Sequence, residues 1–235
     1  MQDLGEAFSL ALALVLSGDA DLLEVVFLSL YVSLTATFAA IAIGVPSGAV
    51  LAITSFPGRK ICLVTVNALM GLPPVVVGLI VYLYLSRSGP LGFLGLLYTP
   101  TAMIIAQAIL ITPIVIALSR QTIEDLHLEY SEAFRSLGLS RVQTVQTLIW
   151  EGRFGLMTVS LAGFGRAIAE VGAVMIVGGN INHVTRVMTT TIALETSKGD
   201  LGMALALGVV LIVLSISINA AMSLAAKSSA RLAYA

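Results

Sequence analysis

Long apolar runs separated by short polar segments dominate the chain. A transmembrane helix needs about 20 mostly apolar residues, and every one of these runs reaches or exceeds that length. The runs are residues 25–54, 61–85, 100–119, 154–179 and 201–226. The short segments of alternating polarity that build an outer-membrane barrel do not stand out. The pattern predicts an all-α integral membrane protein with about five transmembrane helices.

Residues 1–24 precede the first long run and contain a short apolar stretch at 8–16. Asp3 and Glu6 come before this stretch, and no Lys or Arg does. A secretory signal peptide begins with positive charge, so this stretch does not fit one. We therefore expect residues 1–24 to form an N-terminal amphipathic or interfacial helix.

Composition and charge give the orientation of the spans. Of the 235 residues, 58% are hydrophobic and 11% are charged, against about 25% charged in soluble domains. The side with more Lys and Arg carries Arg59, Lys60, Arg120, Arg135, Arg141, Arg153, Lys227 and Arg231. The opposite side carries Arg87, Arg186 and Lys198. Cytoplasmic loops hold the excess of positive residues, so we expect the N-terminus outside and the C-terminus inside.

The chain accordingly divides into the segment 1–24, a transmembrane domain at 25–226 and a cytoplasmic tail at 227–235. The longest polar segment, 120–153, lies on the cytoplasmic side. The net charge of −1 gives no indication of nucleic-acid binding. Cys62 is the only cysteine, which excludes an intrachain disulfide.

Signals for a helix, a turn and a second helix follow one another within the segment 120–153. Gly138 favours a helix end, because glycine adopts a positive φ without a Cβ clash. Ser140 with Gln143 three residues later predicts a capping box that begins a new helix. The helix before Gly138 mixes acidic and apolar positions, which suits docking of a partner outside the membrane. A simple solvated loop is the alternative.

Glu132, Ala133 and Phe134, followed by Gly138 and then by Ile149 eleven residues later, resemble the EAA loop of ABC-importer permeases. In that family the helix before the glycine is the coupling helix, and it sits in a groove of the ATP-hydrolysing subunit. The resemblance therefore implies a type I ABC importer fold and an ATPase partner.

The sequence departs from the family pattern at two places. Phe134 replaces the second alanine, and residues 150–152 (Trp-Glu-Gly) stand where Leu-Pro would be. The residues to which the resemblance assigns ATPase coupling are Glu129, Glu132, Ala133, Phe134, Leu137 and Gly138.

Two further stretches are similar to permeases for molybdate and tungstate. They are GRAIAEVGAVMIVGGNI at residues 165–181 and LPPVVVG at residues 72–78. With the loop, the resemblance covers about residues 25–225. It implies import of an oxyanion by alternating access, and the missing Leu-Pro favours the tungstate branch over the molybdate branch.

The same resemblance implies an assembly in the cytoplasmic (inner) membrane. Its expected members are a second copy of this chain, two copies of a cytoplasmic ABC ATPase and an extracytoplasmic oxyanion-binding protein. The sequence has no GxxxxGK[ST] phosphate loop and no nucleophile elbow. We therefore expect a transporter subunit that is not an enzyme, with no catalytic residue, metal ligand or cofactor of its own. ATP and Mg would be bound by the partner ATPase.

Prolines inside two spans raise the possibility of a movable gate. Pro73-Pro74 and Thr112-Pro113 lie within the second and third apolar runs. Prolines also occur in membrane helices as simple kinks. We favour the gate for Pro73-Pro74 and leave both interpretations open for Thr112-Pro113.

Arg166 and Glu170 are the ionisable residues within the fourth run. Residues four apart share a helix face, so the sequence predicts an intramembrane ion pair. Its charges largely cancel, which favours a structural role over contact with an anion. A stand-alone secondary carrier driven by an ion gradient is the alternative function, with the two residues as a proton relay. That alternative leaves the segment 120–153 without a role.

Overall fold

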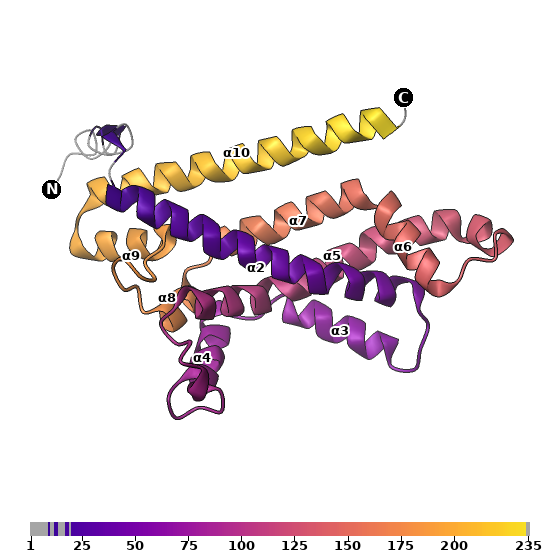
Figure 1. Cartoon of the computed structure of the whole chain (residues 1–235), viewed down its shortest axis with the longest axis horizontal. Coiled ribbons are helices and arrows are strands. Elements are labelled where there is room, and N and C mark those ends of the chain that lie inside the picture. The colour runs from indigo at the N-terminus through magenta and orange to yellow at the C-terminus, as the bar shows by residue number, and fades with distance from the viewer. Residues whose placement is uncertain (1–8, 10–11, 14–16, 19, 234–235) are drawn as a thin grey trace. The chain divides into compact units, whose positions relative to one another are not determined.

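The computed structural model describes residues 9, 12–13, 17–18 and 20–233, with backbone only at 222–223 and 225–233. The elements after residue 19 are all helical, and Figure 1 shows their order. They are α2 (Ala20–Ile53), α3 (Arg59–Leu69), α4 (Pro74–Leu85), the short 3₁₀ helix η1 (Gly92–Leu94), α5 (Pro100–Ser136), α6 (Arg141–Glu151), α7 (Arg153–Ile168), α8 (Gly172–Gly178), α9 (Met188–Lys198) and α10 (Leu201–Ala233).

Three of these helices, α2, α5 and α10, are long and apolar enough to cross a membrane. Two interrupted pairs, α3 with α4 and α7 with α8, pass the same test when each pair is counted as one span. The described part of the chain contains no strand. The predicted class, an all-α membrane protein with about five spans, is confirmed.

The terminal helices extend further than the sequence pattern indicates. Helix α2 begins at Ala20, so Asp21 and Glu24, expected in the N-terminal segment 1–24, lie in the first turns of the first long helix. A negative charge there is favoured by the helix dipole. Helix α10 runs to Ala233, so the backbone of residues 227–233 continues the last helix. Most of the interfacial helix expected at residues 1–24 falls outside the described residues.

The second span is interrupted at the paired prolines, as the sequence predicts. Helix α3 ends at Leu69, and α4 begins at Pro74 with Pro73 as its N-cap in extended geometry. A proline at the first helical position loses nothing, because the N–H it lacks would have no intrahelical partner there. By contrast, α5 continues through Pro113. At that position the proline does not break the helix.

The fourth run, predicted as a span over residues 154–179, also divides into two helices that count as one broken span. Helix α7 ends at Ile168, and α8 begins at Gly172. The Glu170 carboxylate between them accepts a hydrogen bond from the Ala173 N–H at 3.1 Å. This contact spans three residues and satisfies one backbone N–H at the start of α8.

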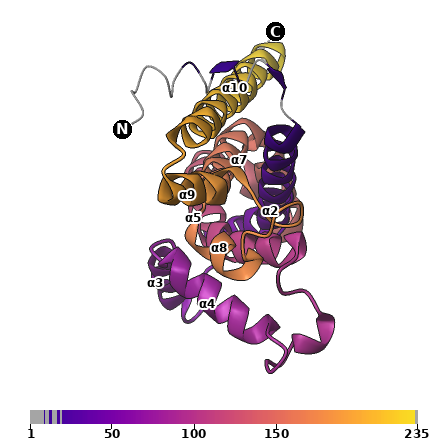
Figure 2. The ribbon, with the colours of Figure 1, turned by 90° about the vertical axis from the view of Figure 1, so that its left-hand side faces the viewer.

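The chain forms two compact units, and α2, α5, α7 and α10 each contribute to both. The first unit contains the described residues within Met1–Ala36, Pro73–Gln107 and Ala167–Asn219. In it, α4 packs directly on α8 (Figure 2), where a Cβ at Gly78 would lie 2.7 Å from the Ala173 Cα. Small residues allow such close packing of membrane helices.

The second unit contains residues within Thr37–Leu72, Ala108–Arg166 and Ala220–Ala235. Here the second half of α2 packs on α5. A Cβ at Gly48 would lie 2.7 Å from the Ile116 carbonyl oxygen, so the two backbones approach as closely as glycine permits.

Candidate functional site

The turn at Gly138 ends α5 and belongs to the second unit. Gly138 has φ +63°, and a Cβ there would meet no atom within 4 Å. The Leu139 N–H donates to the Phe134 carbonyl, and the Gly138 N–H donates to the Arg135 carbonyl, each at 3.1 Å. These two bonds form a Schellman motif, which satisfies carbonyls at the helix end. The predicted glycine stop is confirmed.

The following helix, α6, begins with the predicted capping box. The Ser140 hydroxyl accepts a hydrogen bond from the Gln143 N–H at 3.3 Å. The Gln143 side-chain oxygen accepts one from the Ser140 N–H at 2.9 Å. Thr144 and Leu148 are the buried residues of α6, whereas Val142 is exposed on its other face. Helix α6 therefore packs along one side and leaves the other open.

The residues expected to couple to an ATPase lie around the last turns of α5. Glu129, Glu132 and Ala133 are exposed, and Leu137 keeps 72% of its surface accessible. Their spacing of three to four residues places them on one helix face. We call Glu129, Glu132, Ala133 and Leu137 the α5 end face. It combines two carboxylates with a large exposed apolar side chain, which is typical of a protein-binding surface.

Two of the six expected coupling residues lie elsewhere in this region. Phe134 is half-buried and stacks on Tyr130, with ring centroids 5.9 Å apart. Gly138 forms the turn beyond the face. The structure thus brings four of the six together on one surface, and their role in coupling stays a prediction.

Glu124 anchors this region to the neighbouring helices, a role that sequence reasoning missed. Its carboxylate forms an ion pair with Arg59 at 2.9 Å and a second one with Arg120. Arg59 also donates to the Leu51 carbonyl at 3.0 Å. The start of α3 and the end of α2 are therefore fixed to α5 about one and a half turns before the α5 end face. The sequence shows charges of opposite sign in its polar segments. Which of these charges form ion pairs can be seen only in the folded structure.

A buried polar cluster occupies the first unit, where Glu170 is only 3% exposed. The Thr189 hydroxyl donates to the Glu170 carbonyl at 2.8 Å. The Gln107 amide nitrogen donates to the Ala167 carbonyl at 3.0 Å, while its Oε1 has no partner within the described part of the chain. The cavity between these groups measures about 10 Å³. It can hold at most about one water molecule, not an oxyanion.

Arg166 and Glu170 do not share a helix face in the way the spacing predicts. Arg166 lies in the last turn of α7, and Glu170 follows the end of that helix at Ile168. The argument from helical periodicity therefore fails, although an ion pair between the two side chains stays a prediction. The other two predicted pathway residues, Thr112 and Pro113, lie inside α5, where the Thr112 hydroxyl donates to the Ala108 carbonyl at 2.6 Å.

Helix α9 lies in the polar, Thr-rich segment at residues 180–200, between the fourth and fifth apolar runs, for which the apolar pattern predicts no helix. Thr189, Thr190 and Thr191 are buried on α9. The Thr190 hydroxyl accepts a hydrogen bond from the Val187 N–H at 3.1 Å, which begins the helix. Threonine hydroxyls can be buried when nearby backbone groups form hydrogen bonds with them. The polar composition of this segment therefore does not reveal that it is a buried helix.

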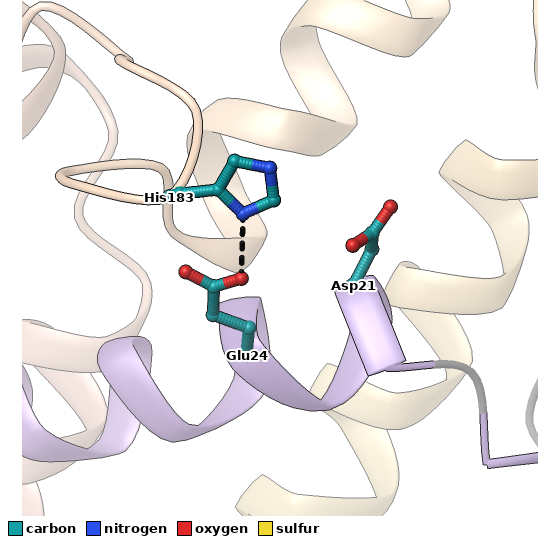
Figure 3. A group of neighbouring side chains, drawn as sticks. All are labelled: Asp21, Glu24 and His183. Carbon is teal, nitrogen blue, oxygen red and sulfur yellow. Dashed lines mark hydrogen bonds and ion pairs between the residues drawn. The ribbon is translucent and has the colours of Figure 1, made fainter.

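Asp21, Glu24 and His183 come together in the first unit (Figure 3). The Glu24 carboxylate contacts His183 Nδ1 at 2.7 Å, and Asp21 lies on the same helix, α2. The hydrogen bond to Glu24, and then its negative charge, raise the pKa of His183 above the usual 6.5. All three side chains are exposed. An ion pair between Glu24 and protonated His183 accounts for their proximity.

The apolar helices and the exposed capped turn define a multi-pass membrane protein with a helix–turn–helix element in a polar segment. Residues 40–230 match the family described as "Binding-protein-dependent transport system inner membrane component". The chain belongs to this family. The predicted resemblance to ABC-importer permeases is thereby confirmed.

Individual relatives differ in how similar they are to this chain. The chain is 44% identical to the "Tungstate uptake system permease protein TupB" of Peptoclostridium acidaminophilum, over 94% of this chain and 96% of that protein. It is 43% identical to the protein of the same name from Campylobacter jejuni, over 70% and 69% of the two chains. Identity to the "Molybdenum transport system permease protein ModB" of Escherichia coli is 26%, over 77% and 83%. The similarity is greater to the tungstate permeases.

Proposed function

We propose that this chain is the membrane-spanning permease subunit of an ABC importer for a tetrahedral oxyanion, with tungstate preferred to molybdate. The observation that carries the proposal is the 44% identity to a tungstate permease over nearly the whole of both chains. The molybdenum permease is more distant, at 26% identity. The permease forms the pathway and performs no covalent chemistry.

The α5 end face would receive the partner ATPase. Two copies of the chain would form the pathway, each docking one ATPase subunit. ATP binding by the ATPase pair would then favour one of two conformations of the spans, which is alternating access as a population shift. The Schellman turn and the capping box support this role, because they hold the exposed face rigidly at the end of a long helix.

The break between α3 and α4 is the element we assign to the gate. Pro73 and Pro74 leave this backbone outside helical geometry, so it can change direction at little cost in hydrogen bonds. Thr112 is a weaker candidate for the gate than its place before Pro113 suggests, because its hydroxyl already donates a hydrogen bond within α5.

The side of the membrane follows from charge. Eight Lys and Arg residues fall on the side of the α5 end face and three on the other, counted in the alternating segments. We place this face in the cytoplasm, the N-terminus outside and the C-terminus inside. An extracytoplasmic binding protein would deliver the anion to the opposite side.

The test is tungstate uptake by cells that express the chain with its ATPase and binding protein. Wild type should take up tungstate and co-purify with the ATPase. Gly138→Pro should lose both, because proline cannot adopt the φ of +63° that the turn requires. The matched control is Gly199→Pro, which disturbs another open glycine with positive φ at the end of a helix, α9, away from the α5 end face.

The outcomes separate the parts of the proposal. Normal uptake by Gly138→Pro would remove the coupling role from the α5 end face. Uptake without any ATPase would favour the secondary carrier. Absence of tungstate uptake in the complete wild-type system, with molybdate uptake intact, would correct the substrate.

A further inference from the structure

A pocket of about 590 Å³ opens in the first unit beside the connection from α4 to α5. Its volume is within the range of small-molecule sites, about 300–1,000 Å³. Its described lining consists mostly of hydroxyl-bearing residues and glycines with one cation. These residues are Tyr82, Leu85, Ser86, Arg87, Ser88, Gly92, Gly95, Leu97 and Tyr98.

Arg87 gives this pocket a positive charge that is not compensated. Its side chain is exposed and makes no hydrogen bond or ion pair with the described residues, and the lining contains no carboxylate. The other cations assigned to this side of the membrane are engaged. Lys198 pairs with Glu195 at 2.9 Å, and Arg186 donates to Asn182 at 2.9 Å.

A second pocket in the same unit has a lining of net negative charge. It measures about 200 Å³ and is lined by Asp21, Glu195 and Asp200 together with Arg186. Three carboxylates and one guanidinium would repel an anion. Of these two pockets, only the Arg87 pocket has a lining with a net positive charge.

Hydroxyl groups surround the Arg87 pocket at several positions. The Ser86 hydroxyl donates to the Leu83 carbonyl at 3.1 Å and lies 3.4 Å from the Ser88 hydroxyl. The rings of Tyr82 and Tyr98 meet edge to face, with centroids 6.3 Å apart. A hydrogen bond with Tyr82 raises the pKa of Tyr98. Neutral O–H groups and a guanidinium together are a donor set for oxyanions.

The connection that carries these groups is folded tightly onto the end of α4. A Cβ at Gly92 would lie 2.2 Å from the Ser86 carbonyl oxygen, and one at Gly89 would lie 2.1 Å from the Leu83 carbonyl oxygen. The Leu91 N–H donates to the Tyr84 carbonyl at 2.9 Å. Such a fixed loop has little freedom to lose when a ligand binds.

We propose that this pocket is an oxyanion-binding site, in which the Arg87 guanidinium and the Ser88, Tyr82 and Tyr98 hydroxyls bind a tetrahedral dianion. The identity of the anion as tungstate rests on the proposed function. The pocket lies just before the start of α5, whereas the α5 end face lies at the other end of that helix. With the α5 end face in the cytoplasm, as proposed above, a membrane-spanning α5 puts this connection on the extracytoplasmic side, where the anion arrives.

The test is binding of sodium tungstate to the purified full-length chain in lipid nanodiscs, without ATPase or binding protein, measured by equilibrium dialysis. Loss of a hydrogen-bonded charge typically weakens binding about tenfold or more. Arg87→Gln should therefore raise the Kd at least that much, and Arg87→Lys should restore part of the affinity. Lys198→Gln is the matched control, because it removes a cation outside the pocket and should leave the Kd unchanged. Thermal unfolding of each variant checks that the chain remains folded.

Each contrary result has a definite meaning. The site is overturned if wild type shows no saturable binding or if Arg87→Gln binds tungstate as tightly as wild type. In either case, continued tungstate uptake by wild-type cells leaves the proposed function standing. A variant that binds tungstate normally but captures the binding protein less tightly would assign Arg87 to a protein carboxylate and overturn the oxyanion site.

Discussion

His183 links the connection between α8 and α9 to the start of α2 through Glu24. Protonated His183 binds the carboxylate more strongly than neutral His183 does, which is why its pKa is raised. The contribution of this pair to stability is therefore fully present below the ordinary histidine pKa of about 6.5. It is lost as the pH rises through the raised pKa of the folded chain.

We accordingly expect the connection around residues 180–187 to loosen as the pH is raised through that value. NMR titration should give a His183 pKa above 6.5, and Glu24→Gln should lower it towards the ordinary value. Glu195→Gln is the control, because Glu195 pairs with Lys198 and not with His183. An unchanged pKa in Glu24→Gln would show that the ion pair does not form in solution.

Single residues differ in how far the sequence reveals them. The conformation of Gly138 and the cap at Ser140 were predictable, because both depend on neighbours within a few residues. The burial of Gln107 and Glu170 was not, because it depends on contacts with residues far along the chain. Charge counting predicts that Arg87 lies on the extracytoplasmic side, but its pocket exists only once the connection folds back onto α4.

At the level of elements, the break between α3 and α4 has the clearest functional consequence. Proline inside a helix costs about 3 kcal/mol or more. Replacing both Pro73 and Pro74 by alanine removes that penalty and allows α3 and α4 to join. We expect uptake to fall while the amount of chain in the membrane stays the same. Uptake assays and hydrogen exchange across residues 70–74 measure both effects.

Pro57→Ala is the control for this double variant, because Pro57 is exposed in the turn before α3. Full uptake by the Pro73→Ala, Pro74→Ala chain would remove the gate from this position. Reduced uptake with a lower amount in the membrane would indicate an assembly defect instead.

The elements with local signals were predictable, and those defined by packing were not. The long apolar runs gave α2, α5 and α10 to within several residues at most ends. The end of α7 and the start of α8 depend on Glu170 reaching the Ala173 N–H. Helix α9 buries threonines that composition assigns to a loop. In both places polar side chains are buried by the rest of the fold, which the apolar pattern does not show.

For the whole molecule, the orientation in the membrane is the prediction that most needs a measurement. Cys62 is the single cysteine of the chain and is exposed, three residues after Arg59. A membrane-impermeant maleimide should label it from the cytoplasmic side only. A Phe93→Cys change in a Cys62→Ser chain should be labelled only from outside, because Phe93 is 83% exposed on the opposite connection.

Labelling after solubilisation in denaturing detergent checks that both thiols are reactive. The reverse pattern, with Cys62 reached from outside, would invert the topology and place the α5 end face away from a cytoplasmic ATPase.

The continuity of α5 also sets a rule for exchanging parts between permeases. One helix joins the membrane span to the α5 end face, and each residue turns it by about 100°. A single residue inserted after Pro113 would therefore swing Glu129 and Glu132 about a quarter turn away from their present direction. An insertion of seven residues would nearly restore the direction but move the face about 10 Å along the axis. A grafted coupling segment must therefore preserve helical phase as well as sequence.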